Sequence, residues 1–522
     1  MFTTSLLSTV PLAGPALLLA AGLLPLTSDL KTPQTLRRSR IASLGALGAA
    51  PIAVLLVVFL PGHRLEWQPV SGFGILLDPV SVTMYTLVAF VGAIVIQYSR
   101  NYLDGDTRQW YFMQSLCLVL AAVLLLTISG NLVLLVMSWI ATSLLLHRLL
   151  VFYPDRPAAQ LAAWKKFVTA RASDAALITA SLCLYLHYGT LDIASILDAA
   201  RTQGASVLPV AAAFLLALAA ILKSAQFPFH GWLPEVMETP TPVSALLHAG
   251  IINAGGFLLI RFADAMTLSP MALAIVALIG LVTAIIGSLS MLTQTSVKVS
   301  LAWSTVAQMG FMLLQCGLGA FSAALVHLVA HSLYKAHAFL SSGSIVEVAR
   351  ANAIAAPMPH GDALISPARQ TGAIAFLATG FAVAALAFSE LRGELILIFV
   401  LGAAVMQMTL SALATLPPGA SRNSLLVQSA ALGLAYFAIQ GMAAWLLSPT
   451  LPTTPTVPAI VALIVITGFA LSWWVQNAAR QTPAPAWLGR LYAPLLNGFY
   501  ANAIFNRLAA TSRLAPAVLK RS

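Results

Sequence analysis

Charge is scarce in this sequence. Only 8% of its 522 residues are Asp, Glu, Lys or Arg, against about 25% in an ordinary soluble domain. Hydrophobic residues make up 59%, and the mean hydropathy is +0.90. Because so few polar side chains cannot cover a water-soluble globule of this size, the composition excludes a soluble enzyme, a nucleic-acid-binding module and a disordered protein.

Cysteine and nucleotide-binding motifs are scarce as well. Cys117, Cys183 and Cys316 are far apart in apolar runs, so no CxxC pair is available for an iron–sulfur cluster or a structural zinc ion. The sequence has neither a Walker loop nor a strand-borne GxGxxG motif. We therefore expect no metal and no cofactor on this chain, and a transport role rather than an enzymatic one.

Apolar runs of about 18 to 25 residues, each long enough to cross a bilayer as a helix, recur along the whole chain. They predict an all-α, polytopic membrane protein with about 15 transmembrane helices. The predicted spans are 7–26, 41–60, 76–98, 111–127, 131–149, 172–189, 208–226, 242–263, 270–292, 298–317, 321–346, 371–389, 394–416, 424–447 and 457–476. We expect one transmembrane domain over 1–480, followed by a basic, mildly amphipathic segment, 481–522, at the cytoplasmic face.

The basic residues predict the orientation of these spans. If the N-terminus lies outside, 21 of the 27 Lys and Arg residues fall on the cytoplasmic side, four fall outside, and Lys223 and Lys335 lie within spans. Such a bias indicates an outside N-terminus and a cytoplasmic C-terminus. It also explains the formal net charge of +11 without a nucleic-acid partner.

Lys223 is the first candidate for a functional residue. It follows the apolar run 210–222, and an ionisable group within a span costs about 2.5–3.5 kcal/mol on insertion scales. A lysine in a low-dielectric setting can exchange a proton near neutral pH, as a proton relay requires. A lysine that extends its ammonium group to the membrane interface is the equally weighted alternative.

The segment after Lys223 is rich in proline. Pro228, Pro234, Pro240 and Pro242 forbid a continuous helix, and broken helices at membrane depth occur where they are buried in protein or line a wet cavity. His248 then lies about one and a half turns into the next apolar run.

A second cluster of ionisable residues is spaced at i, i+4 and i+8. His327, His331 and Lys335 therefore share one face of a helix and form a candidate proton wire. A metal pair is a weaker reading, because a lysine one turn away repels a divalent cation. Histidines that are merely hydrogen-bonded to neighbouring helices are the remaining alternative.

The roles of several other charged residues can also be interpreted from the sequence. Arg171 and Asp174 are one turn apart at the start of a span and can pair, with either role. Asp78 is expected to cap the span that it precedes. Lys165 and Lys166 are expected to be solvated in a basic cytoplasmic loop, 148–171.

Three stretches of the chain resemble a known family. They are 223–255, the motif KVSLAWSTVAQMG from Lys298, and HLVAHSLYKAHAFL from His327. Together they are similar to the proton-conducting antiporter-like family, which includes the large membrane-arm subunits of respiratory complex I and the Mrp-type cation/proton antiporters. The similarity covers roughly 75–420.

The resemblance implies two inverted repeats, each with a broken helix, around a polar axis at mid-membrane depth. It implies that Lys223 is the central lysine of the first half, that His248 is the connecting group, and that His327, His331 and Lys335 belong to the second half. It places Glu390 at the terminal ionisable position, and we include Lys298 in the same proton path.

One position departs from the family pattern. The complex I subunits carry a glutamate just after a tryptophan in the fifth span, and that glutamate pairs with the central lysine. This sequence reads Ser138-Trp139-Ile140-Ala141, so Ile140 stands where the glutamate is expected. The departure argues against a complex I or Mrp assignment.

A narrower resemblance involves 143–153, Asp155-Arg-Pro and Lys165-Lys-Phe. These segments look like the DabB-type branch, membrane subunits of a bacterial inorganic-carbon transport complex. The branch implies a multi-pass subunit of the bacterial inner membrane that conducts protons or sodium ions. It also implies a cytoplasmic DabA-like partner that resembles a zinc β-carbonic anhydrase and hydrates CO2 to bicarbonate.

Two alternatives stay open. One is a proton-translocating subunit of an NADH-quinone oxidoreductase-like or Mrp cation/proton antiporter complex. The other is a membrane anchor for the partner that conducts nothing.

Overall fold

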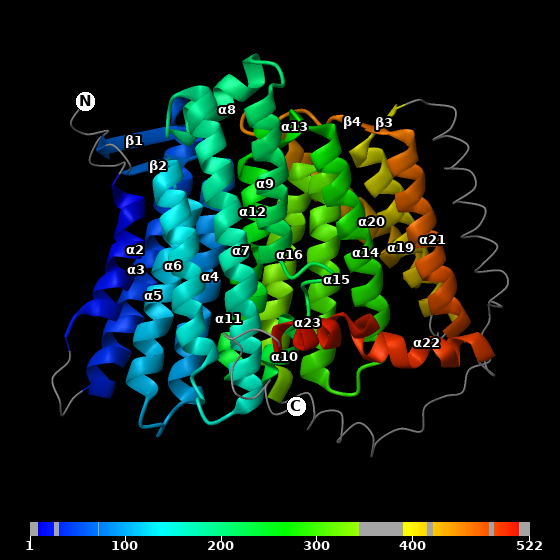
Figure 1. The fold of residues 1–522 in the computed structure, drawn as a ribbon, viewed down its shortest axis with the longest axis horizontal. Coiled ribbons are helices and arrows are strands. Elements are labelled where there is room, and N and C mark those ends of the chain that lie inside the picture. Colours follow the sequence, from blue (N-terminus) through cyan, green and yellow to red (C-terminus); the bar gives the residue numbers. More distant parts are fainter. Residues whose placement is uncertain are drawn as a thin grey trace.

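The computed structural model describes residues 9–25, 31–70, 73–343, 390–414, 421–479 and 485–510. Most of these residues lie in helices that run side by side between two ends of the molecule (Figure 1). Ten of the described helices are long and apolar enough to cross a membrane, and three shorter apolar helices accompany them. This confirms the predicted class, an all-α polytopic membrane protein, while the count of 15 and the orientation stay predictions.

The described helices that precede the proline-rich segment are α2 (Val10–Leu23), α3 (Lys31–Phe59), α4 (Pro79–Tyr102), α5 (Gln109–Thr127), α6 (Leu132–Leu150), α7 (Pro157–Tyr188), α8 (Ile193–Thr202) and α9 (Val207–Lys223). The broken segment comprises α10 (Trp232–Glu235), η3 (Val236–Glu238), α11 (Thr241–Ala249), η4 (Ile251–Asn253) and α12 (Ala254–Arg261). After it come α13 (Ala263–Thr267), α14 (Pro270–Met291), α15 (Val297–Gly317), α16 (Phe321–Leu340), α19 (Gly393–Ala414), α20 (Arg422–Leu447) and α21 (Ala459–Ala479). The predicted span 371–389 lies outside the described residues.

Two short two-stranded sheets lie at one end of the bundle, in addition to the helices. Strands β1 (Leu65–Val70) and β2 (Phe73–Leu77) pair antiparallel, as do β3 (Glu390–Arg392) and β4 (Thr456–Pro458). Both sheets are at the end that also carries α8 and α13 (Figure 1). The opposite end carries the C-terminal helices α22 (Ala486–Leu496) and α23 (Ala501–Ala510), which are joined by η5 (Gly498–Tyr500) and lie across the bundle (Figure 1).

Side-chain caps begin several helices. Asp78 accepts a hydrogen bond of 2.8 Å from the backbone nitrogen of Ser81 at the start of α4, as the sequence predicted. Asn131 caps α6 and Ser269 caps α14 in the same way. Such caps satisfy backbone N–H groups that have no partner within the helix.

The predicted helix break is present. α9 ends at Lys223, and regular helix resumes at Thr241, with only short turns between them. A second interruption, η4, separates α11 from α12 just after Gly250. The two-repeat organisation stays a prediction, because 344–389 lie outside the described residues.

The prediction that 148–171 form a basic loop is wrong. α7 begins at Pro157 and runs for 32 residues, so Lys165, Lys166 and Arg171 all lie within a helix. The loop prediction treated these charges as solvated, whereas the fold buries Lys165 and Lys166 against polar partners from other segments.

Small residues allow α14 and α15 to approach closely. A Cβ atom at Gly280 would lie 2.5 Å from the backbone nitrogen of Leu314, and one at Gly310 would lie 2.5 Å from that of Ala284. Contacts of this kind are the usual basis of helix association in a bilayer, where apolar burial contributes little.

We predict that Gly280→Val forces α14 and α15 apart. Overpacking of this kind costs about 1–3 kcal/mol, so the variant should unfold at a clearly lower temperature in detergent. Gly48→Val in α3 is the matched control, because nothing lies within 4 Å of the added Cβ. Equal melting temperatures for the two variants would contradict the close packing.

Candidate functional site

Ionisable side chains, most of them buried, form two groups within the bundle. We call Lys166, Arg171, Asp174 and Lys223, from α7 and α9, the lysine cluster. We call His248, His327, His331 and Lys335, from α11 and α16, the histidine cluster. Both contain residues that the sequence singled out, and the helix break lies between them.

Lys223 ends α9 and is only 6% exposed. Its Nζ donates a hydrogen bond of 3.3 Å to the backbone carbonyl of Trp139 and lies 4.2 Å from the centre of the Trp139 ring. A carbonyl oxygen and an aromatic face both favour a cation. Trp139 thus contacts the lysine directly, next to the position where Ile140 replaces the family's glutamate.

Asp174 is the carboxylate of the lysine cluster. It forms an ion pair of 2.7 Å with Arg171, one turn away on α7. The side chain of Asp174 is buried, whereas that of Arg171 is about one third exposed. Within this cluster the negative charge therefore lies on α7, whereas Ile140 on α6 carries none.

Lys166 was not anticipated as a buried residue. It is 5% exposed, and its Nζ donates hydrogen bonds of 2.6 Å and 2.9 Å to the backbone carbonyl and the hydroxyl of Ser143. The spacing from Lys166 to Asp174 is eight residues, which places both on one face of α7. That periodicity was the signal in the sequence that could have identified it.

The histidine cluster lies along α11 and α16. His248 Nδ1 shares a hydrogen bond of 2.9 Å with the Thr305 hydroxyl, and its ring stacks on that of Phe339 at 4.4 Å between centroids. Lys335, fully buried, donates to the backbone carbonyl of Leu301 at 3.0 Å. The stacking of His248 on Phe339 shows that α11 packs against α16, the helix that also carries Lys335.

His327 and His331 continue the cluster along α16. Their ring centroids are 6.1 Å apart, as expected for an i, i+4 pair. His327 Nδ1 lies 2.7 Å from the side-chain oxygen of Gln315 on α15.

The break at 250–253 connects the two clusters. The carbonyl of Ile252, released from regular helix geometry, accepts a hydrogen bond of 3.0 Å from Ser224, the neighbour of Lys223. Asn253 donates to Ser332, the neighbour of His331, at 2.8 Å. No direct hydrogen bond joins Lys223 to His248 among the described residues, so the broken helix is the protein element that bridges them.

Three further charged residues lie at the end that carries α10 and α23. Lys165 Nζ contacts both carboxylate oxygens of Glu235, at 2.6 and 2.8 Å, and donates to the Asn502 side-chain oxygen at 2.9 Å. Asn502 also donates to Glu235, so α23 is fastened to the proline-rich segment. Lys298, at the start of α15, donates to the Thr241 hydroxyl at 3.1 Å.

Glu390 lies in β3, and its side chain falls outside the described residues. Within the described part of the chain, no three His, Cys, Asp or Glu side chains come together as a metal site would require. The expectation of a chain without metal or cofactor stays a prediction.

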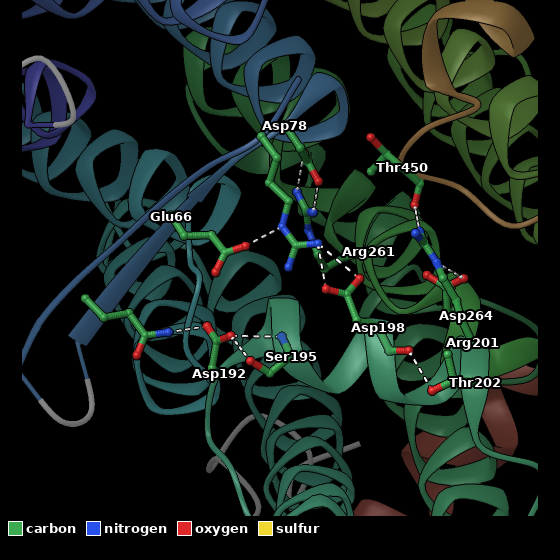
Figure 2. Close-up of polar contacts among 12 residues, drawn as sticks. Glu66, Asp78, Asp192, Ser195, Asp198, Arg201, Thr202, Arg261, Asp264 and Thr450 are labelled. Atoms are coloured by element: carbon green, nitrogen blue, oxygen red, sulfur yellow. Dashed lines mark hydrogen bonds and ion pairs between the residues drawn. The ribbon is translucent and has the colours of Figure 1, made fainter. Parts of the chain in front are cut away.

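The opposite end carries a network of ion pairs (Figure 2). Arg261, the last residue of α12, pairs with Asp78 at 2.5 Å, and both side chains are almost fully buried. Arg201 pairs with Asp264 at 2.9 Å and also donates to the carbonyl of Thr450. Arg201 and Arg261 are two of the four basic residues that the predicted topology assigns to the outside, whereas the structure makes Arg261 a buried anchor of the broken helix.

A third arginine belongs to this network. Arg64 pairs with Glu66 at 2.5 Å and with Asp198 at 3.0 Å. Burial raises the pKa of the Glu66 carboxyl above its ordinary value, although the neighbouring Arg64 opposes that shift.

Two family models match the chain. One, described as NADH:quinone oxidoreductase/Mrp antiporter, TM, matches 129–358 and thus includes every residue of both clusters. The other, described as NADH-Ubiquinone oxidoreductase (complex I), chain 5 N-terminus, matches 67–113.

Curated relatives and solved structures agree with these models. The chain is 45% identical over 346 residues to the probable inorganic carbon transporter subunit DabB2 of Halothiobacillus neapolitanus, an alignment that covers 64% of this chain and 63% of that protein. It is 49% identical over 286 residues to the probable inorganic carbon transporter subunit DabB of Hydrogenovibrio crunogenus, which covers 54% and 55%. The match thus spans little more than half of the length of these relatives.

The fold is similar to one in the structure of the Mrp complex from Dietzia sp. DQ12-45-1b. The TM-score is 0.64 at 24% identity, and the match covers 99% of this chain and 61% of that chain. Together with the family models, this confirms the resemblance that the sequence motifs indicated.

We predict that Asp78→Asn destabilises the protein by about 3–5 kcal/mol, because it leaves the buried Arg261 without a counter-charge while a capping oxygen remains. Adding Arg261→Met should recover much of the loss. Chemical unfolding in mixed micelles measures both effects. The exposed pair Arg156–Glu238, at 3.4 Å, is the control, and Arg156→Gln should cost less than about 1 kcal/mol.

Proposed function

Because this chain belongs to the antiporter-like family of membrane subunits shared by NADH:quinone oxidoreductases and Mrp antiporters, we propose that it is the ion-conducting subunit of an inorganic-carbon uptake complex. Protons or sodium ions pass through the membrane domain, and their flow drives a partner that hydrates CO2 in one direction. The observation that supports conduction best is the series of buried ionisable groups from Lys166 to His331 across one broken helix.

Unpartnered polar atoms support a hydrated path. The Nε2 atoms of His248, His327 and His331 have no hydrogen-bond partner among the described residues, and neither does the side-chain oxygen of Asn253. Buried polar atoms in proteins are satisfied by water where protein groups do not reach them. Water at these positions would complete a proton path between the side chains.

The chemistry of the clusters favours protons over sodium ions. The clusters contain three lysines, three histidines and an arginine beside a single aspartate. Such groups bind and release protons, but they repel a metal cation, which prefers several oxygen ligands. In this proposal Asp174 serves as the counter-charge of Lys223, so that movement of the Arg171–Asp174 pair alters how strongly Lys223 holds its proton.

Inorganic carbon as the substrate class is supported by the two relatives named as inorganic carbon transporter subunits. A membrane potential supplies about 2.3 kcal/mol per charge per 100 mV, which is enough to bias a hydration near equilibrium more than tenfold per proton. We propose a zinc-containing, carbonic-anhydrase-like partner of the DabA type on the cytoplasmic face, and the bacterial inner membrane as the location.

The partner is proposed to bind at the end that carries the C-terminal helices. Arg148 and Arg156 lie near that end of α6 and α7, and the basic segment 481–522 belongs to it by sequence. Positive charge is typical of the cytoplasmic side, where such a partner would bind.

A second candidate function is a subunit of a quinone oxidoreductase or Mrp antiporter complex, which the family-model description favours. Co-purification from native membranes separates the two. One large zinc protein as the partner supports the carbon proposal, whereas a set of redox or antiporter subunits overturns it.

We predict that Lys223→Met abolishes growth at air-level CO2 and lowers ion flux into vesicles carrying the purified complex at least tenfold. Methionine has nearly the same volume as lysine, so the packing should stay intact, while the buried charge beside Trp139 is lost. Lys31→Met, at the exposed start of α3, is the control and should keep both activities. Normal growth and flux in the Lys223 variant would contradict the conduction proposal and would favour the alternative of a membrane anchor that conducts nothing.

We further predict that Asp174→Asn lowers the same flux, and that adding Ile140→Glu restores part of it. The second change returns a carboxylate to α6, next to the tryptophan that contacts Lys223. Flux in the double variant should exceed that in Asp174→Asn alone. If Ile140→Glu gives no recovery, or if Asp174→Asn conducts normally, Asp174 is not the counter-charge.

A further inference from the structure

A groove lined by arginines lies between α3 and α4, far from the two clusters. It holds about 560 Å³, and its lining includes Arg37 and Arg40 from α3 and Arg100 from α4, together with Leu36, Ile41 and Leu44. α3 and its neighbour α2 form one edge of the bundle (Figure 1). The groove therefore faces the surroundings of the protein rather than its interior.

The three arginines bring uncompensated positive charge to this groove. None of them forms an ion pair within the described residues, and no carboxylate belongs to the lining. Arg100 donates Nη1 to Gln97, while its Nε is buried without a hydrogen-bond partner. Three guanidinium groups around one cavity repel each other, so an anion held among them is stabilised.

The apolar part of the lining is arranged along the helix axis. Leu36 lies beside the arginines, and Ile41 and Leu44 follow them on α3 with side chains more than half exposed. The rise from Arg37 to Leu44 is roughly 10 Å. The groove thus offers cationic groups at the end of a span and an apolar surface one to two turns further into it.

We propose that this groove is a binding site for an anionic phospholipid, whose phosphate lies among Arg37, Arg40 and Arg100 and whose acyl chain packs on Ile41 and Leu44. A free phosphate ion would use only the charged half, which is why the lipid fits better. Basic pockets of this kind at the ends of spans recognise acidic lipid headgroups. The site does not depend on the proposed transport activity.

The test uses the purified full-length chain after removal of lipid, titrated with phosphatidylglycerol in detergent. A ligand that binds only the folded state raises the melting temperature with its concentration. We expect phosphatidylglycerol to do so, and phosphatidylcholine and inorganic phosphate not to. In Arg37→Gln/Arg40→Gln the half-saturating phosphatidylglycerol concentration should rise at least tenfold.

A matched control removes the same charge from the same helix. Lys31 lies 5.2 Å from the Trp110 ring centre and Arg38 donates to the carbonyl of Pro25 at 3.0 Å, so neither lines the groove. Lys31→Gln/Arg38→Gln should respond to phosphatidylglycerol as the natural protein does. The single variant Arg100→Gln, read by native mass spectrometry of retained lipid, serves if the double variant does not fold.

Three results would overturn the proposal. One is an equal loss of response in the control, which would indicate a diffuse electrostatic effect. Another is an equal response to phosphatidylcholine, which would indicate a general requirement for lipid. The third is an equal response to inorganic phosphate, which would indicate an anion site without a lipid chain.

Discussion

Hydrocarbon cannot hydrogen-bond, so every charge and every released backbone group within a membrane span must find a partner inside the protein. The rest of this structure depends on that constraint. The helix break around 250–253 is compatible with it because Ser224 satisfies the carbonyl of Ile252 and the Asn253 side chain satisfies that of Ala249. Asn253 also bonds to Ser332, so these side chains join the broken helix to the neighbours of Lys223 and His331. A requirement of the bilayer thus also positions the ionisable groups.

The constraint explains what the sequence could and could not predict. Hydropathy located isolated spans well: α14 and α15 begin and end within one residue of the predicted 270–292 and 298–317. Hydropathy failed at α7, because the charges of Lys165 and Lys166 lower the average hydropathy of the surrounding residues, and the two lysines were therefore assigned to a loop. Their burial depends on Glu235 and Ser143, 70 and 23 residues away in the chain. Partners at such separations are set by tertiary packing, which no local pattern contains. By contrast, the spacing of Lys166 and Asp174 on one face of α7 is a local pattern, so the sequence alone could have identified it.

The absence of the fifth-span glutamate acquires a physical meaning in this arrangement. Lys223 contacts the tryptophan of that motif, through its carbonyl and its ring, and the carboxylate of the lysine cluster, Asp174, lies on α7. Asp174 is not a free carboxylate, since Arg171 binds it at 2.7 Å. The cluster thus presents an ion pair, Arg171–Asp174, rather than a single anion. The electric field that such a pair exerts on a nearby lysine depends on the geometry of the pair, which a displacement of α7 would change.

Both ends of the broken helix are fastened, and in different ways. At the end of α12, Arg261 and Asp78 form a buried pair that ties the segment to the start of α4. At the start of the proline-rich segment, Glu235 binds Lys165 of α7 and Asn502 of α23. α7 therefore carries both the counter-charge of Lys223 and the lysine that anchors Glu235, on one continuous helix of 32 residues. Any displacement of α23 that pulls on Glu235 and Lys165 acts on the same helix as Asp174. Through Asn502, α23 thus contacts the helix that carries Asp174, at the position of Lys165.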